Sequence, residues 1–182
     1  MAFPGFRRRS KHELAGFRLY GAAVAAAREP LLYRDLGVAD TLDGRFDLLC
    51  LYSFLLIRRV QREPEPGPAL AQAVFDAMFS DMDVNLREMG VGDLSVGRRV
   101  RAMWEALHGR AVAYGAAMDA GDTVALEAAI ARNVWRGATA PAGSAAALVR
   151  LANAQAACLD GQAWDALAAG DVRLLPAGEA VR

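Results

Sequence analysis

The chain has 182 residues, of which 54% are hydrophobic and 23% charged, and its 21 basic side chains balance 21 acidic ones. A chain of this length and composition can bury enough apolar surface to fold as one soluble globular domain, so a disordered protein is excluded. The zero net charge argues against a general nucleic-acid-binding protein, and we expect no DNA partner.

The cysteines and the N-terminus bear on the cellular compartment. Cys50 and Cys158 lie far apart without a CxxC motif, so neither a zinc site nor a redox pair is indicated. The N-terminus is basic, but the apolar segment of a secretory signal does not follow it. The longest nearly uncharged stretch, residues 48–57, is much shorter than the roughly 18 residues that a membrane span requires. We therefore expect a cytoplasmic protein.

The secondary structure is expected to be entirely helical. Alanine is abundant, β-branched residues are sparse and alternating apolar and polar runs are absent, so the sequence predicts an all-α fold. We expect a single compact bundle of about seven or eight helices over residues 10–170, with a flexible basic segment at 1–9 and a fraying tail at 171–182. Caps, glycines and prolines place the helices at about 10–29, 30–37, 41–62, 69–89, 96–118, 122–137, 144–159 and 162–169.

The first helix begins with a capping-box pattern. Ser10 is followed three residues later by Glu13, so Ser10 is the expected N-cap. At helical spacing the helix carries Leu14, Phe17, Gly21 and Val24 on one side.

The third helix is apolar on nearly every side between residues 46 and 57. A helix of this kind is either central in the bundle or in contact with something apolar outside it. A core helix is the simpler interpretation. The alternative is a helix that binds a client or a membrane surface and ends in the basic residues Arg58, Arg59 and Arg62.

The fourth helix is amphipathic and acidic. Its apolar stripe is either core or an adaptable binding surface, and consists of Phe75, Met78, Phe79, Met82, Leu86 and Met89. Asp76, Asp81, Asp83 and Glu88 are similar to the acidic helices that hold magnesium on diphosphates, which makes a metal-dependent enzyme an alternative hypothesis. The acids fall on both flanks of the stripe and cannot all meet one ion. Asp83 and Arg87 have the i,i+4 spacing of a helix-stabilising pair.

The fifth helix follows a glycine-rich turn at residues 90–97 and is rich in arginine. Residues 63–94 hold seven acidic side chains and one arginine, whereas residues 95–110 hold four arginines and one glutamate. Arg98 and Arg99 in the first turn oppose the helix macrodipole, which indicates an acidic partner. That partner is either the acidic fourth helix or another molecule.

No catalytic constellation emerges from the sequence. His12 and His108 lack metal-binding spacing, the serines lie outside nucleophile motifs, and Cys50 is expected to be a buried apolar residue with a raised pKa. We therefore expect a binding protein that is not an enzyme and uses no cofactor.

Four blocks of sequence resemble one known family. They are Asp-Thr-Leu-Asp-Gly-Arg-Phe-Asp-Leu at 40–48, Phe-Asp-Ala-Met-Phe-Ser-Asp-Met-Asp at 75–83, Leu-Arg-Glu-Met-Gly-Val-Gly-Asp-Leu-Ser-Val-Gly-Arg-Arg-Val at 86–100, and Gly-Arg-Ala-Val-Ala-Tyr at 109–114. In this order they resemble the ubiquinol–cytochrome c chaperone family, over residues 12–137. Leu107 and His108 depart from the pattern, because family members carry two aromatic residues there. The alanine-rich helices at 138–170 lie outside the resemblance.

The resemblance implies an all-helical assembly factor for ubiquinol–cytochrome c reductase, complex III of the respiratory chain. It implies binding of newly made cytochrome b or another complex III subunit, near the ribosomal tunnel exit. A bacterial-type member would work on the cytoplasmic side of the inner membrane, with peripheral membrane contact. An amphipathic membrane-surface protein without a specific client is a further alternative.

The candidate partner-binding residues fall into three sets. We assign the basic set, Arg98, Arg99, Arg101 and Arg110, to acidic partners, lipid or ribosomal RNA. We assign an acidic set to basic client loops, and it consists of Asp76, Asp83 and Glu88, with Arg87 beside Asp83. Asp43 and Arg45 are expected to hold the entry to the third helix, with partner contact as their other role.

Overall fold

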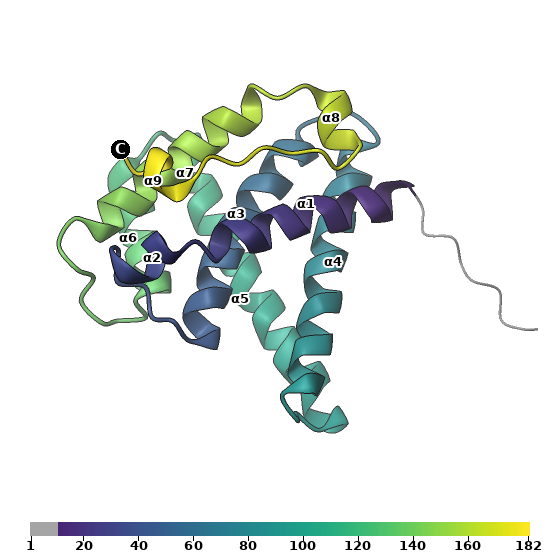
Figure 1. The fold of residues 1–182 in the computed structure, drawn as a ribbon, viewed down its shortest axis with the longest axis horizontal. Helices are drawn as coiled ribbons and strands as arrows, with labels where there is room; N and C mark the ends of the chain where they lie inside the picture. Colours follow the sequence, from purple (N-terminus) through teal and green to yellow (C-terminus); the bar gives the residue numbers. More distant parts are fainter. Residues whose placement is uncertain (1–10) are drawn as a thin grey trace, which may run out of the picture.

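The structure, a computed structural model, describes residues 11–182, which fold into nine α-helices without a strand (Figure 1). The helices are α1 (Lys11–Ala27), α2 (Pro30–Arg34), α3 (Leu42–Gln61), α4 (Gly67–Glu88), α5 (Asp93–Asp119), α6 (Thr123–Val134), α7 (Ser144–Asp160), α8 (Trp164–Ala168) and α9 (Ala177–Ala180). The predicted all-α fold is confirmed. The expected cap Ser10 and the expected flexible segment 1–9 lie outside the described residues.

Helix α3 forms the centre of the bundle and packs against α1, α4, α5, α6 and α7. Thr41 caps it, because the Thr41 hydroxyl accepts a hydrogen bond from the Gly44 amide at 3.2 Å. Its apolar residues from Phe46 to Leu56 are buried, and Leu48, Cys50 and Leu51 have no exposed surface. The core interpretation of this helix is therefore confirmed, and residues 46–56 present no exposed apolar face to a membrane surface.

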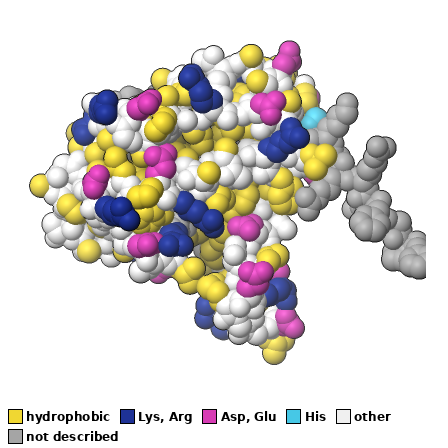
Figure 2. Space-filling model, viewed as in Figure 1, with side chains coloured by type: hydrophobic (Ala, Val, Ile, Leu, Met, Phe, Trp, Pro, Cys, Tyr) yellow, Lys and Arg dark blue, Asp and Glu magenta, His cyan; other side chains and the backbone are white. Residues whose placement is uncertain are grey.

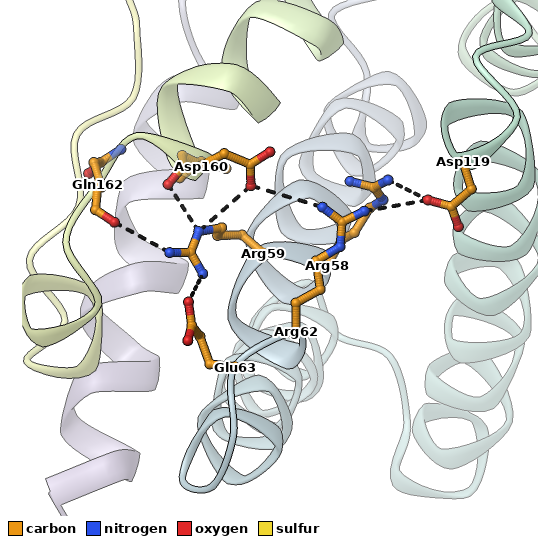
Figure 3. Close-up of polar contacts among 8 residues, drawn as sticks. Arg58, Arg59, Arg62, Glu63, Asp119, Asp160 and Gln162 are labelled. Carbon is orange, nitrogen blue, oxygen red and sulfur yellow. Dashed lines mark hydrogen bonds and ion pairs between the residues drawn. The ribbon is translucent and has the colours of Figure 1, made fainter.

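The arginines at the end of α3 join this helix to α5 and α7 (Figure 3). Arg58 and Arg62 both reach Asp119 at the end of α5, at 2.5 and 3.4 Å. Arg59 bonds to Glu63 at 2.7 Å and donates to the Leu159 carbonyl at 3.1 Å. These arginines therefore stabilise the fold. The membrane-surface hypothesis was based on an apolar helix followed by basic residues, and both the helix and Arg58 and Arg59 are engaged inside the protein.

Helices α4 and α5 form a hairpin whose end extends beyond the rest of the bundle (Figure 1). We call this end, residues 84–101, the arm. Gly90 has a φ of +79°, and the Val91 amide closes the end of α4 on the Leu86 carbonyl at 3.0 Å. Helix α5 begins at Asp93, so the predicted glycine-rich turn over 90–97 is shorter than expected. Arg87 holds the turn, because it pairs with Asp83 and Asp93.

Only part of the predicted side of α1 packs, because Phe17 and Val24 are half-buried against the core, whereas Leu14 and Gly21 are exposed. Leu14 is 51% exposed, whereas Ala15, Leu19 and Ala23 are buried. A Cβ atom on Gly16 would lie 2.6 Å from the Ala73 carbonyl carbon of α4. The small side chains of α1 allow this close crossing, which a ranking by apolar size does not predict.

The C-terminal segment packs against the bundle, so the predicted fraying of residues 171–182 is wrong. Ala177 and Ala180 are buried. The buried Gln155 accepts from the Leu175 amide at 3.0 Å and donates to the Leu175 carbonyl at 2.7 Å. The Ala177 amide donates to Glu29 at 2.7 Å. Side chains of α1–α2 and α7 thus satisfy a backbone that lacks regular hydrogen bonds of its own.

Candidate partner-binding groove

A groove of about 630 Å³ lies between α1, α3, α4 and α5, where the arm leaves the body of the molecule. Its walls are mainly apolar and include Val24, Leu42, Phe46, Leu49, Met82, Leu86, Met89 and Met103. Figure 2 shows hydrophobic side chains interspersed with charged ones on the surface around the base of the arm. A concave apolar surface with a few polar groups is the usual form of a binding site.

The apolar stripe of α4 packs into the core over its first part and lines the groove over its second part. Met78 is fully buried in the core. Phe75 and Phe79 pack on each other, with ring centroids 4.6 Å apart. Further along, Met82 and Met89 face the groove. The core interpretation therefore holds for the first part of the stripe, and the binding-surface interpretation is consistent with the second.

One wall of the groove carries a tyrosine–carboxylate pair. The Tyr20 hydroxyl donates to Asp81 Oδ2 at 2.6 Å, and both residues line the groove. Burial, and then the Asp81 carboxylate, raise the pKa of Tyr20 far above its usual range, so this hydroxyl stays protonated. One turn along α4, the Asn85 side-chain amide donates to the Asp81 carbonyl at 2.8 Å.

Two predicted residues lie where α3 begins, at the edge of the groove. Arg45 pairs with Asp40 at 2.6 Å, and this guanidinium lowers the pKa of Asp40. Asp43 pairs at 2.8 Å with Arg136, which follows α6. The ion pairs agree with the expected role of Asp43 and Arg45 at the entry to this helix.

Glu88 and Arg99 line the groove from the two helices of the arm. Within residues 11–182 neither forms an ion pair, and the same is true of Arg98. The suggestion that the acidic fourth helix neutralises Arg98 and Arg99 is therefore wrong. The groove thus brings together four predicted residues, namely Asp43, Arg45, Glu88 and Arg99.

The other exposed candidates lie outside the groove. Asp76 accepts a hydrogen bond from Gln72 at 2.7 Å, and Arg101 pairs with Glu105 at 3.0 Å along α5. Asp83 pairs with Arg87 at 2.6 Å, which lowers the pKa of Asp83. The i,i+4 pair predicted from the sequence is thus present, and it stabilises the arm.

Arg110 is not available to a partner, so its assignment as a binding residue is wrong. Its side chain is 9% exposed and pairs at 2.5 Å with Asp47, which has no exposed surface. Arg136 also bonds to Asp47, at 2.8 and 3.1 Å. The helical period explains the burial, because Arg110 follows Leu107 by three residues and precedes Tyr114 by four, and both are buried.

The sequence analysis did not identify three residues of this region, namely Tyr20, Asp47 and Arg136, and it did not pair Asp81 with Tyr20. The position of Asp47 could have been noticed, because a carboxylate within an almost entirely apolar helix requires a buried cation. Nothing in the sequence indicates the role of Arg136, since its position depends on a left-handed φ of +49° after α6.

The magnesium and diphosphate hypothesis finds no support in the geometry. Asp76, Asp81 and Asp83 each bond to a different side chain. Over residues 11–182, no three His, Cys, Asp or Glu side chains are grouped so that they could hold a metal ion. No helix in the same range is both long enough and apolar enough to cross a membrane.

Comparisons with known proteins agree on one family. The family described as Ubiquinol-cytochrome C chaperone matches residues 34–174, so its match reaches the C-terminal helices that the resemblance left out. A crystal structure of the Cbp3 homolog from Brucella abortus is 36% identical, with a TM-score of 0.82 and 93% of each chain covered.

A related frog protein, the ubiquinol-cytochrome-c reductase complex assembly factor 1 of Xenopus laevis, is 22% identical over 124 residues. The match covers 68% of this chain, which spans 62% of the frog protein's length. From the extent of the family match and the shared fold, the chain belongs to the ubiquinol–cytochrome c chaperone family.

Proposed function

We propose that this protein is an assembly chaperone for ubiquinol–cytochrome c reductase, and that its client is newly made cytochrome b. The main supporting observation is an apolar groove with a charged rim, in a chain of the ubiquinol–cytochrome c chaperone family. The related frog protein is named as an assembly factor of the same complex. A holding role requires a surface and no chemical step, so we propose no catalytic activity.

The groove suits a client that belongs in a membrane. Transmembrane helices are apolar along their length and carry charged residues near their ends. Outside the bilayer such a helix needs a surface that covers its apolar side chains. Met82, Met89 and Met103 can adapt to different side chains, because methionine is flexible and polarisable.

Gene deletion with complementation tests this function. We expect the deletion strain to lose assembled complex III and quinol oxidation, and wild-type protein to restore both. Met103→Glu places a charge in the apolar groove and should fail to restore them. Val112→Glu, on the same helix at a site 59% exposed and outside the groove, should succeed. Normal complex III in the deletion strain would refute the function, and equal complementation by both variants would refute the site.

We also propose that the protein works at the cytoplasmic face of the inner membrane, close to the ribosome. The exposed Arg98 and Arg99, which have no ion pair within residues 11–182, can bind anionic lipid or RNA phosphate. In fractionated cells, wild-type protein should be recovered with membranes or ribosomes, and the double variant Arg98→Glu/Arg99→Glu should be released. Recovery of the wild type in the soluble fraction alone would contradict this location.

A further inference from the structure

Asp81 is a groove carboxylate that has no cationic partner within the described residues. Its Oδ2 accepts from the Tyr20 hydroxyl at 2.6 Å, and no Lys, Arg or His within residues 11–182 forms an ion pair with it. Asn85 uses an amide hydrogen on the Asp81 carbonyl, so its side-chain oxygen remains an acceptor. This wall therefore offers acceptors to a ligand that enters the groove.

The other groove charges are differently placed. Asp43 and Arg45 already have partners in Arg136 and Asp40. Arg28, Glu88 and Arg99 are exposed on the rim, where water screens them, whereas Asp81 is partly buried among apolar side chains.

An occupant of the groove would remove water from Asp81. A purely apolar occupant would leave an ionised carboxylate buried without a partner, which is strongly unfavourable. An ammonium or guanidinium on the occupant would meet that carboxylate and form a charge-assisted hydrogen bond. The apolar walls, Met82 and Met103 among them, would cover the rest of the occupant's surface.

We propose that the groove binds the apolar face of a helix that carries one basic side chain, and that this side chain pairs with Asp81. The proposal rests on the function proposed above and specifies the chemistry of the client segment. A volume of about 630 Å³ accommodates several side chains of one helical face rather than an entire helix. Asp81 is then the residue that selects between apolar segments.

Binding of two synthetic peptides to the purified full chain tests the proposal. The probes are amphipathic helices of about 16 residues that differ at one central position of the apolar face, which is Lys in one and Gln in the other. Fluorescence anisotropy should show roughly tenfold tighter binding of the Lys peptide, as expected for a partly exposed charged hydrogen bond. Equal binding of the two peptides, or binding of neither, would overturn the proposal without any variant.

Variants of Asp81 test whether this residue causes the preference for the Lys peptide. Asp81→Asn should remove the preference, and Asp81→Lys should make the protein prefer a third peptide with Glu at the central position. Asp165→Asn, an exposed carboxylate on α8 away from the groove, should leave the Lys preference unchanged. A Lys preference that survives Asp81→Asn would refute the role of Asp81. Complex III assembly in the deletion strain is a separate measurement, so failure of the peptide preference is distinguishable from failure of the proposed function.

Discussion

Replacement of Arg110 by methionine should strongly destabilise the fold, because it leaves Asp47 as a buried charge. Asp47 has no exposed surface and receives three hydrogen bonds, one from Arg110 at 2.5 Å and two from Arg136 at 2.8 and 3.1 Å. Removal of one partner from a buried ion pair generally costs about 3–5 kcal/mol. Arg136 remains in the variant, and the buried Arg110 Nε has no hydrogen-bond partner in the described part of the chain. We therefore expect the lower end of the range, about 3 kcal/mol.

Arg101 is the matched control on the same helix. Its side chain is 80% exposed and, among residues 11–182, pairs only with Glu105, so Arg101→Met should change the free energy of unfolding by less than about 0.5 kcal/mol. Urea unfolding followed by circular dichroism measures both variants. Equal effects of the two substitutions, or a loss below about 1 kcal/mol for Arg110→Met, would refute the argument from burial.

A double-mutant cycle tests whether the cost comes from the stranded charge. Asp47→Asn combined with Arg110→Met removes both charges of the pair and leaves Arg136 partly exposed. The loss of stability in the double variant should therefore be smaller than the sum of the two single losses, by about 2 kcal/mol. Additive losses would mean that packing, rather than charge, accounts for the effect.

Three further predictions concern the fold. Gly16→Ala should destabilise the protein by about 1–3 kcal/mol, because its Cβ would lie 2.6 Å from the Ala73 carbonyl carbon. A Cβ on Gly21 meets no atom of residues 11–182 within 4 Å, so Gly21→Ala should stabilise α1 by about 0.5–1 kcal/mol. Thermal unfolding compares the two variants. Gln155→Ala should cost about 2–3 kcal/mol in urea unfolding, since it leaves two backbone groups of the C-terminal segment unpaired. Burial raises the pKa of Tyr114 to about 12, above the value of about 10 for an unfolded tyrosine. The stabilisation that comes from keeping the Tyr114 hydroxyl protonated in the folded state is fully present below pH 10 and is lost between about pH 10 and 12. The urea midpoint should therefore fall across that window more in wild type than in Tyr114→Phe.

The helices could be predicted because their limits depend on local chemistry. Thr41 and Asp122, the first residues of the predicted ranges 41–62 and 122–137, both accept hydrogen bonds from backbone amides, from Gly44 at 3.2 Å and from Ala125 at 2.9 Å. Each of these bonds spans only three residues, so no knowledge of the tertiary structure was needed.

The packing of α1 and of the C-terminal segment could not be predicted, because both depend on distant partners. Gly16 lies close to Ala73, and Leu175 bonds to Gln155, twenty residues away. Neither pairing has a periodic or local signature in the sequence. Apolar size favoured Leu14 as a packing residue of α1, whereas small residues make the contact with α4.

The candidate site was predicted in part, because the sequence gives the sign of each charge and the fold decides its partner. Arg99 and Arg110 look alike in the sequence, yet the first is exposed and unpaired within residues 11–182 while the second is buried against Asp47. The position of each arginine around the helix explains the difference in burial, since Arg110 shares the face of the buried Leu107 and Tyr114.

Replacing a charge that is paired inside the protein should have a different effect from replacing an unpaired charge at the groove. Asp47 and Arg110 satisfy each other inside the protein, so their replacement should lower stability. Glu88 and Arg99 border the groove, are exposed and have no ionic partner within the described residues, so the fold gains little from their charges. Their replacement should alter binding and leave the unfolding midpoint almost unchanged. A groove variant that impairs complex III assembly at unaltered stability would therefore identify a client contact rather than a folding defect.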